Sequence, residues 1–177
     1  ENSPMMQEPN WTFDTESEDI SIYLSSHGEL YVFDTENNKI VSVRERGLME
    51  WEHSFGYNLT RLADFNSKST FIVTENDYEN RLSKLDTSEG TKLWSNTFNE
   101  GINDIVVNDK NQIYLSSYSG EIIKLSKNGD LIWNKTISKN KEPIDIELGN
   151  DENLYVFSKN DDIYYLNPEG KELWNLN

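Results

Sequence analysis

The sequence predicts an all-β protein built from repeated units of four antiparallel strands. Its tryptophans recur at intervals of 40, 43, 39 and 41 residues, which indicates an internal repeat. Between them, short runs of β-branched and aromatic residues alternate with clusters of Asn, Asp, Ser and Gly, the composition of strands and turns. No stretch keeps the 3.6-residue apolar period of a helix. The repeating tryptophans are Trp11, Trp51, Trp94, Trp133 and Trp174.

The chain is expected to form one domain after a short arm. Residues 1–10 contain Pro4 and Pro9 and no apolar pattern, which indicates a flexible acidic arm. A single domain is predicted over residues 11–177, because a chain of 177 residues suits one hydrophobic core. Its repeats are placed at about 11–50, 51–93, 94–132 and 133–177.

The third unit shows the four strands most clearly. They are predicted at 104–108, 112–116, 121–126 and 130–137, separated by turns rich in Asn, Ser and Gly. The second strand of every unit is apolar on successive residues, which predicts burial on both faces, whereas the strand with the tryptophan alternates. The second strands contain Leu30–Phe33, Thr70–Val73, Ile113–Leu115 and Leu154–Phe157.

A glycine precedes each of the last four tryptophans by four residues. We expect it to close the hairpin between the third and fourth strands, through a positive φ or a tight turn, and to fix where the indole lies. A four-stranded unit cannot cover both of its faces, so the units are predicted to stack as four β-propeller blades with each indole against the adjoining blade. Core packing, ahead of ligand contact, is the role predicted for Trp51, Trp94, Trp133 and Trp174. The glycines are Gly47, Gly90, Gly129 and Gly170.

Residues Leu85 to Trp94, LDTSEGTKLW, resemble the tryptophan-docking motif of the pyrroloquinoline-quinone-type (quinoprotein) β-propeller repeat family. The resemblance implies that Asp86, Glu89 and Gly90 brace the turn while Trp94 wedges between blades. The other units have one residue fewer in this turn and lack the Asp, and so resemble the cofactor-free, exported branch of the family. No cofactor is predicted.

The number of units is a second point of comparison with that family. Its rings generally have seven or eight blades, whereas residues 19–177 provide four. Asn10–Phe13 resembles the outer strand of a further unit, which could add to a blade edge. Three explanations stay open: a piece of a longer protein, two chains that complete one ring, or a closed ring of four blades. Because open end blades promote association, we favour a partial ring or one completed by a homo-oligomer.

Composition excludes several classes of partner and site. Asp and Glu total 32 against 16 Lys and Arg, a formal charge of −16, which opposes binding to nucleic acid or anionic lipid. No apolar run approaches the length of a bilayer span, so no membrane insertion is expected. The chain has no cysteine, which excludes disulfides, thiolate metal sites and cysteine nucleophiles. It begins at Glu1 without a signal-like segment, so a mature product or an excised piece is expected.

The sequence shows no catalytic pattern, and no catalytic or metal-binding residue is predicted. His27 could be paired with Asp34, but this histidine and His53 lack a nucleophile elbow and metal-ligand spacing, so both are interpreted as ordinary residues. Two oxygen-rich stretches are interpreted as hairpin turns, since neither has the alternating carboxylates that Ca²⁺ requires. They are Asn108–Asn111 and Gly149–Asn153. A solvated acidic surface is the interpretation of Glu16, Glu18, Asp19, Asp161 and Asp162.

Three functions are weighed. The preferred hypothesis is a non-enzymatic propeller scaffold for protein–protein interaction, placed by the resemblance outside the cell or in the cell envelope. It would act through loops or strand edges. A surface propeller that binds carbohydrate or another small ligand through Tyr57, Tyr78 and Tyr118 is the alternative. A fragment of a quinone-dependent dehydrogenase is the third, and the short blade count and missing cysteines count against it.

Overall fold

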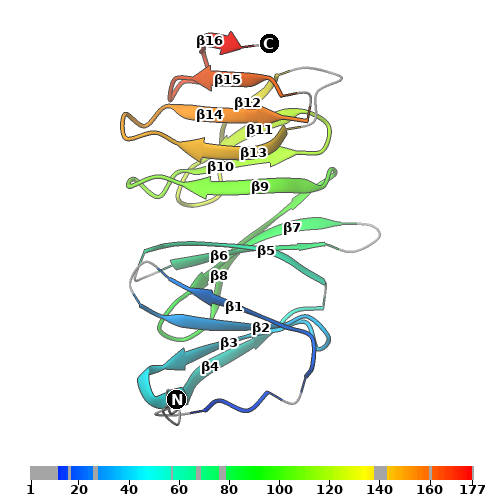
Figure 1. Ribbon diagram of the computed structural model, residues 1–177, viewed down its shortest axis with the longest axis vertical. Coiled ribbons are helices and arrows are strands. Elements are labelled where there is room, and N and C mark those ends of the chain that lie inside the picture. The colour runs from blue at the N-terminus through cyan, green and yellow to red at the C-terminus, as the bar shows by residue number, and fades with distance from the viewer. Residues whose placement is uncertain are drawn as a thin grey trace, which may run out of the picture.

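The computed structural model is all-β and confirms four four-stranded antiparallel sheets (Figure 1). The structure describes residues 12–15, 17–25, 28–56, 58–66, 69–75, 79–137, 143–159 and 161–176. Within these residues, each sheet is one blade whose strands are paired in chain order. The predicted arm of residues 1–10 lies outside the described residues, as does Trp11.

The strand bounds follow the repeat. Blade 1 has β1 Ile20–Leu24, β2 Leu30–Asp34, β3 Lys39–Arg44 and β4 Leu48–Ser54, with a 3₁₀ turn η1 Glu45–Gly47 before β4. Blade 2 has β5 Asn58–Asn66, β6 Ser69–Glu75, β7 Asn80–Asp86 and β8 Lys92–Phe98. Blade 3 has β9 Ile102–Val107, β10 Ile113–Ser117, β11 Glu121–Leu125 and β12 Leu131–Thr136. Blade 4 has β13 Pro143–Leu148, β14 Leu154–Ser158, β15 Ile163–Leu166 and β16 Glu172–Leu176.

The hydrophobic core lies in the seams between blades. Every residue of β10 is buried, as the run of apolar residues predicts for a second strand, and β6 is buried except at its last residue. The blades follow one another along the long axis of the molecule, with β1–β4 at one end and β13–β16 at the other (Figure 1). Phe71 of blade 2 packs with Leu115 of blade 3, and Tyr114 of blade 3 packs with Val156 of blade 4. Each sheet therefore buries its apolar residues against the neighbouring sheets.

Each seam is held by a tryptophan that lies on the glycine turn of the following blade. In the seam between blades 1 and 2, the Trp51 indole is buried, and its Nε1 donates to the carbonyl of Thr87 at 2.6 Å. A Cβ added at Gly90 would lie 2.4 Å from Cε3 of Trp51, so the ring rests directly on the glycine. The turn glycine thus does two things: it closes its own hairpin with φ +66° and seats the preceding blade's indole.

The next two seams repeat this contact. In both, the indole N–H donates to the carbonyl two residues before a turn glycine, and a Cβ added at that glycine would crowd the ring. The pairs are Trp94 with Lys127 (3.2 Å) above Gly129, and Trp133 with Pro168 (3.0 Å) above Gly170. Core packing is thereby confirmed for Trp51, Trp94 and Trp133.

Blades 2 and 3 add a lysine to the same acceptor. The lysine side chain lies over the ring of an aromatic residue on the second strand of its own blade. Its ammonium also donates to the carbonyl that accepts the indole N–H. One carbonyl of the next blade therefore accepts from two donors of the preceding blade. Lys84 lies 5.4 Å from the Phe71 ring centroid and 3.4 Å from Lys127 O. Lys124 lies 4.8 Å from the Tyr114 ring centroid and 2.9 Å from Pro168 O.

The prediction of a buried indole is wrong for Trp174. This side chain is 45% exposed because no sheet follows blade 4 among the described residues. It stacks on Tyr165 of its own blade, with ring centroids 5.1 Å apart, and lies 6.3 Å from the ring of Tyr155. The opposite end of the molecule is covered: Phe13 packs against Val32, Val41 and Val43 of blade 1. The described residues 12–15 form no strand there, which departs from the expected outer strand.

The glycine turns are braced by polar side chains. Asp86 Oδ1 accepts from the N–H groups of Ser88 (2.9 Å) and Glu89 (3.2 Å), and the Asp86 carbonyl accepts from Gly90 N. Asp86 and Gly90 therefore brace the turn as the resemblance implies, whereas Glu89 contributes its backbone N–H and its side chain is exposed. In the shorter turns the same task falls to Ser126 Oγ and Asn167 Oδ1, which accept from backbone N–H groups.

A carboxyl pair joins the inner strands of blades 3 and 4. Asp104 Oδ2 of β9 accepts from the backbone N–H of Ile146 in β13 at 2.9 Å, and its carboxyl lies beside Asp145. Burial, and next the contact with Asp145, raise the pKa of Asp104 to about 6, although the N–H groups of Ile146 and Ile105 oppose the shift. The folded protein therefore binds this proton more tightly than the unfolded chain.

Substituting Gly90 with alanine should separate the two tasks of a turn glycine. We expect Gly90→Ala to lower the free energy of unfolding by roughly 3 kcal/mol, because about 1–2 kcal/mol of positive-φ strain adds to the clash with Trp51. Gly28→Ala is the matched control, since Gly28 has φ +87° and nothing within 4 Å of an added Cβ. Gly28→Ala should lower the free energy of unfolding only by the positive-φ strain, about 1–2 kcal/mol. Urea unfolding measures the loss of unfolding free energy in both variants. Equal losses would contradict the claim that the Trp51 ring rests on Gly90.

A second substitution tests the carboxyl pair. Because the pKa of Asp104 is raised, its contribution to stability is complete below pH ~4 and is lost as the pH rises through about 6. Asp145→Asn removes the neighbouring negative charge and should raise the melting temperature at pH 7 by on the order of 2 °C. At pH 4 the gain should vanish. A gain that is the same at both pH values, measured by calorimetry, would show that the two carboxyls do not interact.

Candidate interaction surface

The outer strand of each blade presents a free edge. Strands β4, β8, β12 and β16 each pair with a single neighbour among the described residues. In every blade the ladder between the third and fourth strands shifts register just before the tryptophan, which is a β-bulge. The bulge leaves one residue without a partner across the ladder, directly before the indole. Those residues are Glu50, Leu93, Ile132 and Leu173.

Exposed aliphatic side chains gather at these bulges. We call them the outer-strand band, and they lie within three residues after a turn glycine in each blade. Their exposure is set by the turn and the bulge, which direct the indole into the seam and these neighbours toward solvent. The band consists of Leu48, Met49, Leu93, Leu131, Ile132 and Leu173, each 46% to 65% exposed.

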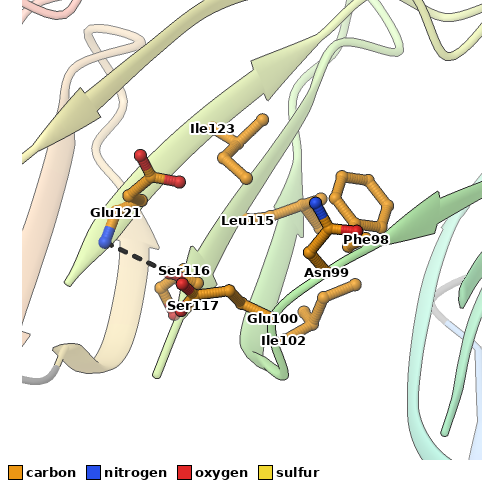
Figure 2. A pocket seen from close by; sticks show the side chains of 9 residues that line it. All are labelled: Phe98, Asn99, Glu100, Ile102, Leu115, Ser116, Ser117, Glu121 and Ile123. Carbon is orange, nitrogen blue, oxygen red and sulfur yellow. Dashed lines mark hydrogen bonds between the residues drawn. The ribbon is translucent and has the colours of Figure 1, made fainter. Parts of the chain in front are cut away.

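Two hollows lie in the seam between blades 2 and 3, and the larger of them reaches the band. The smaller one, of about 210 Å³, has Phe98, Leu115 and Ile123 in its wall together with Glu100 and Ser117 (Figure 2). Ser117 Oγ accepts from the Glu121 N–H at 3.2 Å, the bond drawn dashed in Figure 2. The chemistry of this hollow is mixed, because both apolar and polar side chains line it.

The larger hollow connects this wall to the band. It has a volume of about 420 Å³ and shares Phe98 and Ile123 with its neighbour. Leu131 of the band lines it, and the Asn96 side chain at its edge donates to the carbonyl of Gly129 at 2.5 Å. An apolar side chain from a partner would find contacts here with Phe98, Ile123 and Leu131.

The tyrosines considered for carbohydrate binding do not form a described cluster. Tyr57 and Tyr78 lie outside the described residues. Tyr118 is 51% exposed, and its ring lies against Gly101, where an added Cβ would approach Cδ2 to 2.2 Å. Its backbone N–H donates to Gly101 O at 3.0 Å. Tyr118 is thus partly a packing residue at the end of β10.

Asp34 and His53 take part in local structure. His27 lies outside the described residues. Asp34 is buried and accepts from the N–H and the side chain of Asn37 at 2.9 and 2.8 Å. Burial alone would raise the pKa of Asp34, but these hydrogen bonds and Lys39 hold it below the ordinary value. His53 lies 4.7 Å from the Phe55 ring, and burial, then the charge of Lys92, lower the pKa of its imidazole.

The two oxygen-rich stretches close hairpins. In the turn between β9 and β10, Asn108 Oδ1 accepts from the N–H groups of Lys110 and Gln112 at 3.1 and 2.9 Å. The second turn, between β13 and β14, is joined to the first by an ion pair from Lys110 Nζ to Glu152 at 2.7 Å. Among the residues that the structure describes, no three metal-ligating side chains cluster.

The predicted acidic surface is only partly solvated. Glu18, Asp19 and Asp161 are exposed, while Glu16 lies outside the described residues. Asp162 is buried and accepts from Ser158 Oγ at 3.3 Å, so it supports a turn instead of a surface. In the described part of the chain, no helix is long and apolar enough to cross a membrane.

The fold is shared with known β-propellers. BamB from Moraxella catarrhalis superposes with a TM-score of 0.69 at 14% identity, over 94% of this chain and 64% of that one. Virginiamycin B lyase from Staphylococcus aureus gives 0.73 at 16% identity, over 92% and 56%. A protein of unknown function from Bacteroides caccae gives 0.65 at 14% identity, over 88% and 59%. The chain spans less than two thirds of each of these structures.

The family is shown by the sequence itself. None of the curated proteins matches the chain. A protein family described as "Outer membrane protein assembly factor BamB" matches residues 8–177, the whole repeat region. The resemblance to quinoprotein-type propeller repeats is confirmed, and the chain belongs to this BamB-like family of β-propeller proteins.

Proposed function

We propose that the protein is a non-enzymatic β-propeller scaffold that binds another protein through the outer-strand band. The observation that supports this is the recurrence of an exposed aliphatic side chain at the bulge of blades 2, 3 and 4, with Leu48 and Met49 exposed beside the bulge of blade 1. A folded domain rarely repeats such exposure without a partner to cover it. The hollow beside Leu131 gives a partner side chain a place to insert.

Recognition through side chains fits the band better than simple strand addition. A β-bulge interrupts the regular row of N–H and C=O groups at each outer edge, and bulged edges discourage unselective pairing. A partner segment with apolar side chains spaced to meet neighbouring blades would contact Leu93 and Ile132 together. The polar groups beside the hollow, such as Asn96 and Asn134, would then set its orientation.

A place outside the cell or in the cell envelope is part of the proposal. The family to which the chain belongs is described as an outer membrane protein assembly factor. The absence of cysteine and the acidic composition are compatible with a place outside the cell or in the cell envelope. An enzymatic role has less support. The structural neighbours include virginiamycin B lyase and a streptogramin B lyase, but at 16% and 21% identity they share only the fold with this chain.

The carbohydrate alternative has one described residue in its favour. Tyr118 is half exposed, but its ring also packs on Gly101. The other two tyrosines of this hypothesis, Tyr57 and Tyr78, lie outside the described residues. A quinone-dependent dehydrogenase would need a carboxylate-bound Ca²⁺, and no cluster of three metal-ligating side chains exists within the described ranges. Neither alternative explains the band.

A charge placed in the band should abolish binding without unfolding the protein. We expect Ile132→Lys to weaken capture of envelope proteins by at least about tenfold, because a charge at a hot-spot position would have to be desolvated. Thr136→Lys is the matched control, since Thr136 is also exposed on β12 and the charge added is the same. Pull-downs quantified by mass spectrometry measure both. If both variants capture the same proteins as the parent chain, the band is not the binding surface.

A further inference from the structure

We propose that the two hollows between blades 2 and 3 form one groove for an extended segment of a protein partner. The segment places an apolar side chain in the larger hollow and a lysine or arginine in the smaller one. This inference rests on the proposed binding function, and it names the chemistry of the segment that the outer-strand band would bind. Three features support it: the continuity of the hollows, the carboxylates of the smaller one, and the charge of the chain.

The two hollows share a wall, so one segment can occupy both. Phe98 of β8 and Ile123 of β11 line each of them. Both side chains are partly buried and pack against the core of the seam. The larger hollow also includes Leu131 of the band, whereas the smaller one includes Ile102 of the inner strand β9. A segment that binds the band at Leu131 therefore continues along the same wall into the smaller hollow.

The charges of the groove are confined to the smaller hollow. Among the described residues that line the two hollows, the only charged side chains are Glu100, in the turn between β8 and β9, and Glu121, the first residue of β11. Figure 2 shows Glu121 on the opposite side of the view from Phe98, with Ile123 between them. An apolar wall beside carboxylates suits a lysine or arginine, which packs its methylene groups on apolar surface and extends its cationic head to an acidic group.

The two carboxylates are not used by the fold. Within the described ranges, neither Glu100 nor Glu121 forms an ion pair or a side-chain hydrogen bond. Glu121 lies three residues before Lys124, which pairs with the tryptophan of its blade. The residues at this position in the other blades all have partners. They are Lys39, paired with Asp34, Arg81, paired with Glu79, and Asp162, which accepts from Ser158 Oγ.

A basic residue beside an apolar one fits the groove better than other segments. A wholly apolar segment would cover the two carboxylates without replacing their hydration, which is costly. An acidic segment would be repelled by these carboxylates and by the net charge of −16. A basic side chain in the smaller hollow compensates the carboxylates, and the same net charge attracts it from a distance. The larger hollow has no charged side chain among its described lining residues, so the apolar side chain belongs there.

Selection from a displayed library of random short peptides, on the folded 177-residue chain, tests the proposal. We expect enriched peptides to carry an aliphatic or aromatic residue with a lysine or arginine within about three positions, because an extended segment advances ~3.3 Å per residue. On the double variant Glu100→Gln with Glu121→Gln, the apolar residue should stay enriched, and the basic residue should return to its frequency in the library.

The matched control is the double variant Glu18→Gln with Glu147→Gln. It removes the same charge at exposed positions that line neither hollow. We expect it to select the same peptides as the parent chain, because the net charge alone does not define the groove. An unchanged melting temperature of both double variants shows that the folded state is the species compared.

Fluorescence anisotropy with the most enriched peptide measures the contact in solution. The substitutions at Glu100 and Glu121 should weaken its binding by about tenfold, and added salt should narrow this difference. Glutamine in place of the basic residue of the peptide should cause the same loss on the parent chain and no further loss on the Glu100 and Glu121 double variant. Ile132→Lys should weaken the binding of both peptides, because it places a charge in the band.

The outcomes separate this inference from the proposed function. Apolar peptides without a basic residue, selected on the parent chain, would overturn the inference and leave the band as the binding surface. Basic residues that stay enriched on the Glu100 and Glu121 double variant, or that the control variant loses, would also overturn it, since they would reflect net charge alone. If no peptide is enriched, or if Ile132→Lys leaves binding unchanged, the inference and the proposed function both fail.

Discussion

The contact on which the structure depends is an indole resting on a peptide that has no side chain. Second strands that are apolar on both faces cannot be covered within one sheet, so each blade needs a neighbour at a fixed distance. Trp51, Trp94 and Trp133 set that distance, because only a glycine in the next turn lets the ring approach the backbone. The indole N–H bond to a turn carbonyl then fixes the rotation of one sheet against the other.

The repeat period and the strand and turn composition are enough to predict the architecture. What they could not reveal is the identity of the glycine under each indole. The sequence pairs Trp94 with Gly90, four residues earlier, whereas the ring lies on Gly129, in the next blade. Because Gly90 and Gly129 occupy the same position in successive repeats, the sequence alone does not show which of the two glycines the Trp94 ring contacts. Trp174 was mispredicted for the same reason: its role needs a following blade, and a single repeat cannot show whether one is present.

The candidate surface was harder to foresee than the core. Leu93 and Ile132 are large aliphatic residues in strands, so composition alone assigns them to the interior. Their exposure arises from a bulge, and a bulge is a property of the pairing between two strands. The alternation around each tryptophan was visible, but the additional unpaired residue became apparent only from the ladder. Polar braces such as Ser126 were similarly hidden, since serine in a turn is too common to be informative.

Because the same contact recurs in three seams, it can be observed at three places in one experiment. Hydrogen exchange of the indole Nε1–H groups, followed by NMR, measures whether each N–H is held by a turn carbonyl. The account predicts that Trp51, Trp94 and Trp133 exchange as slowly as the backbone amides of the buried strands β6 and β10. Exchange of these three groups at the rate of a free indole would contradict it.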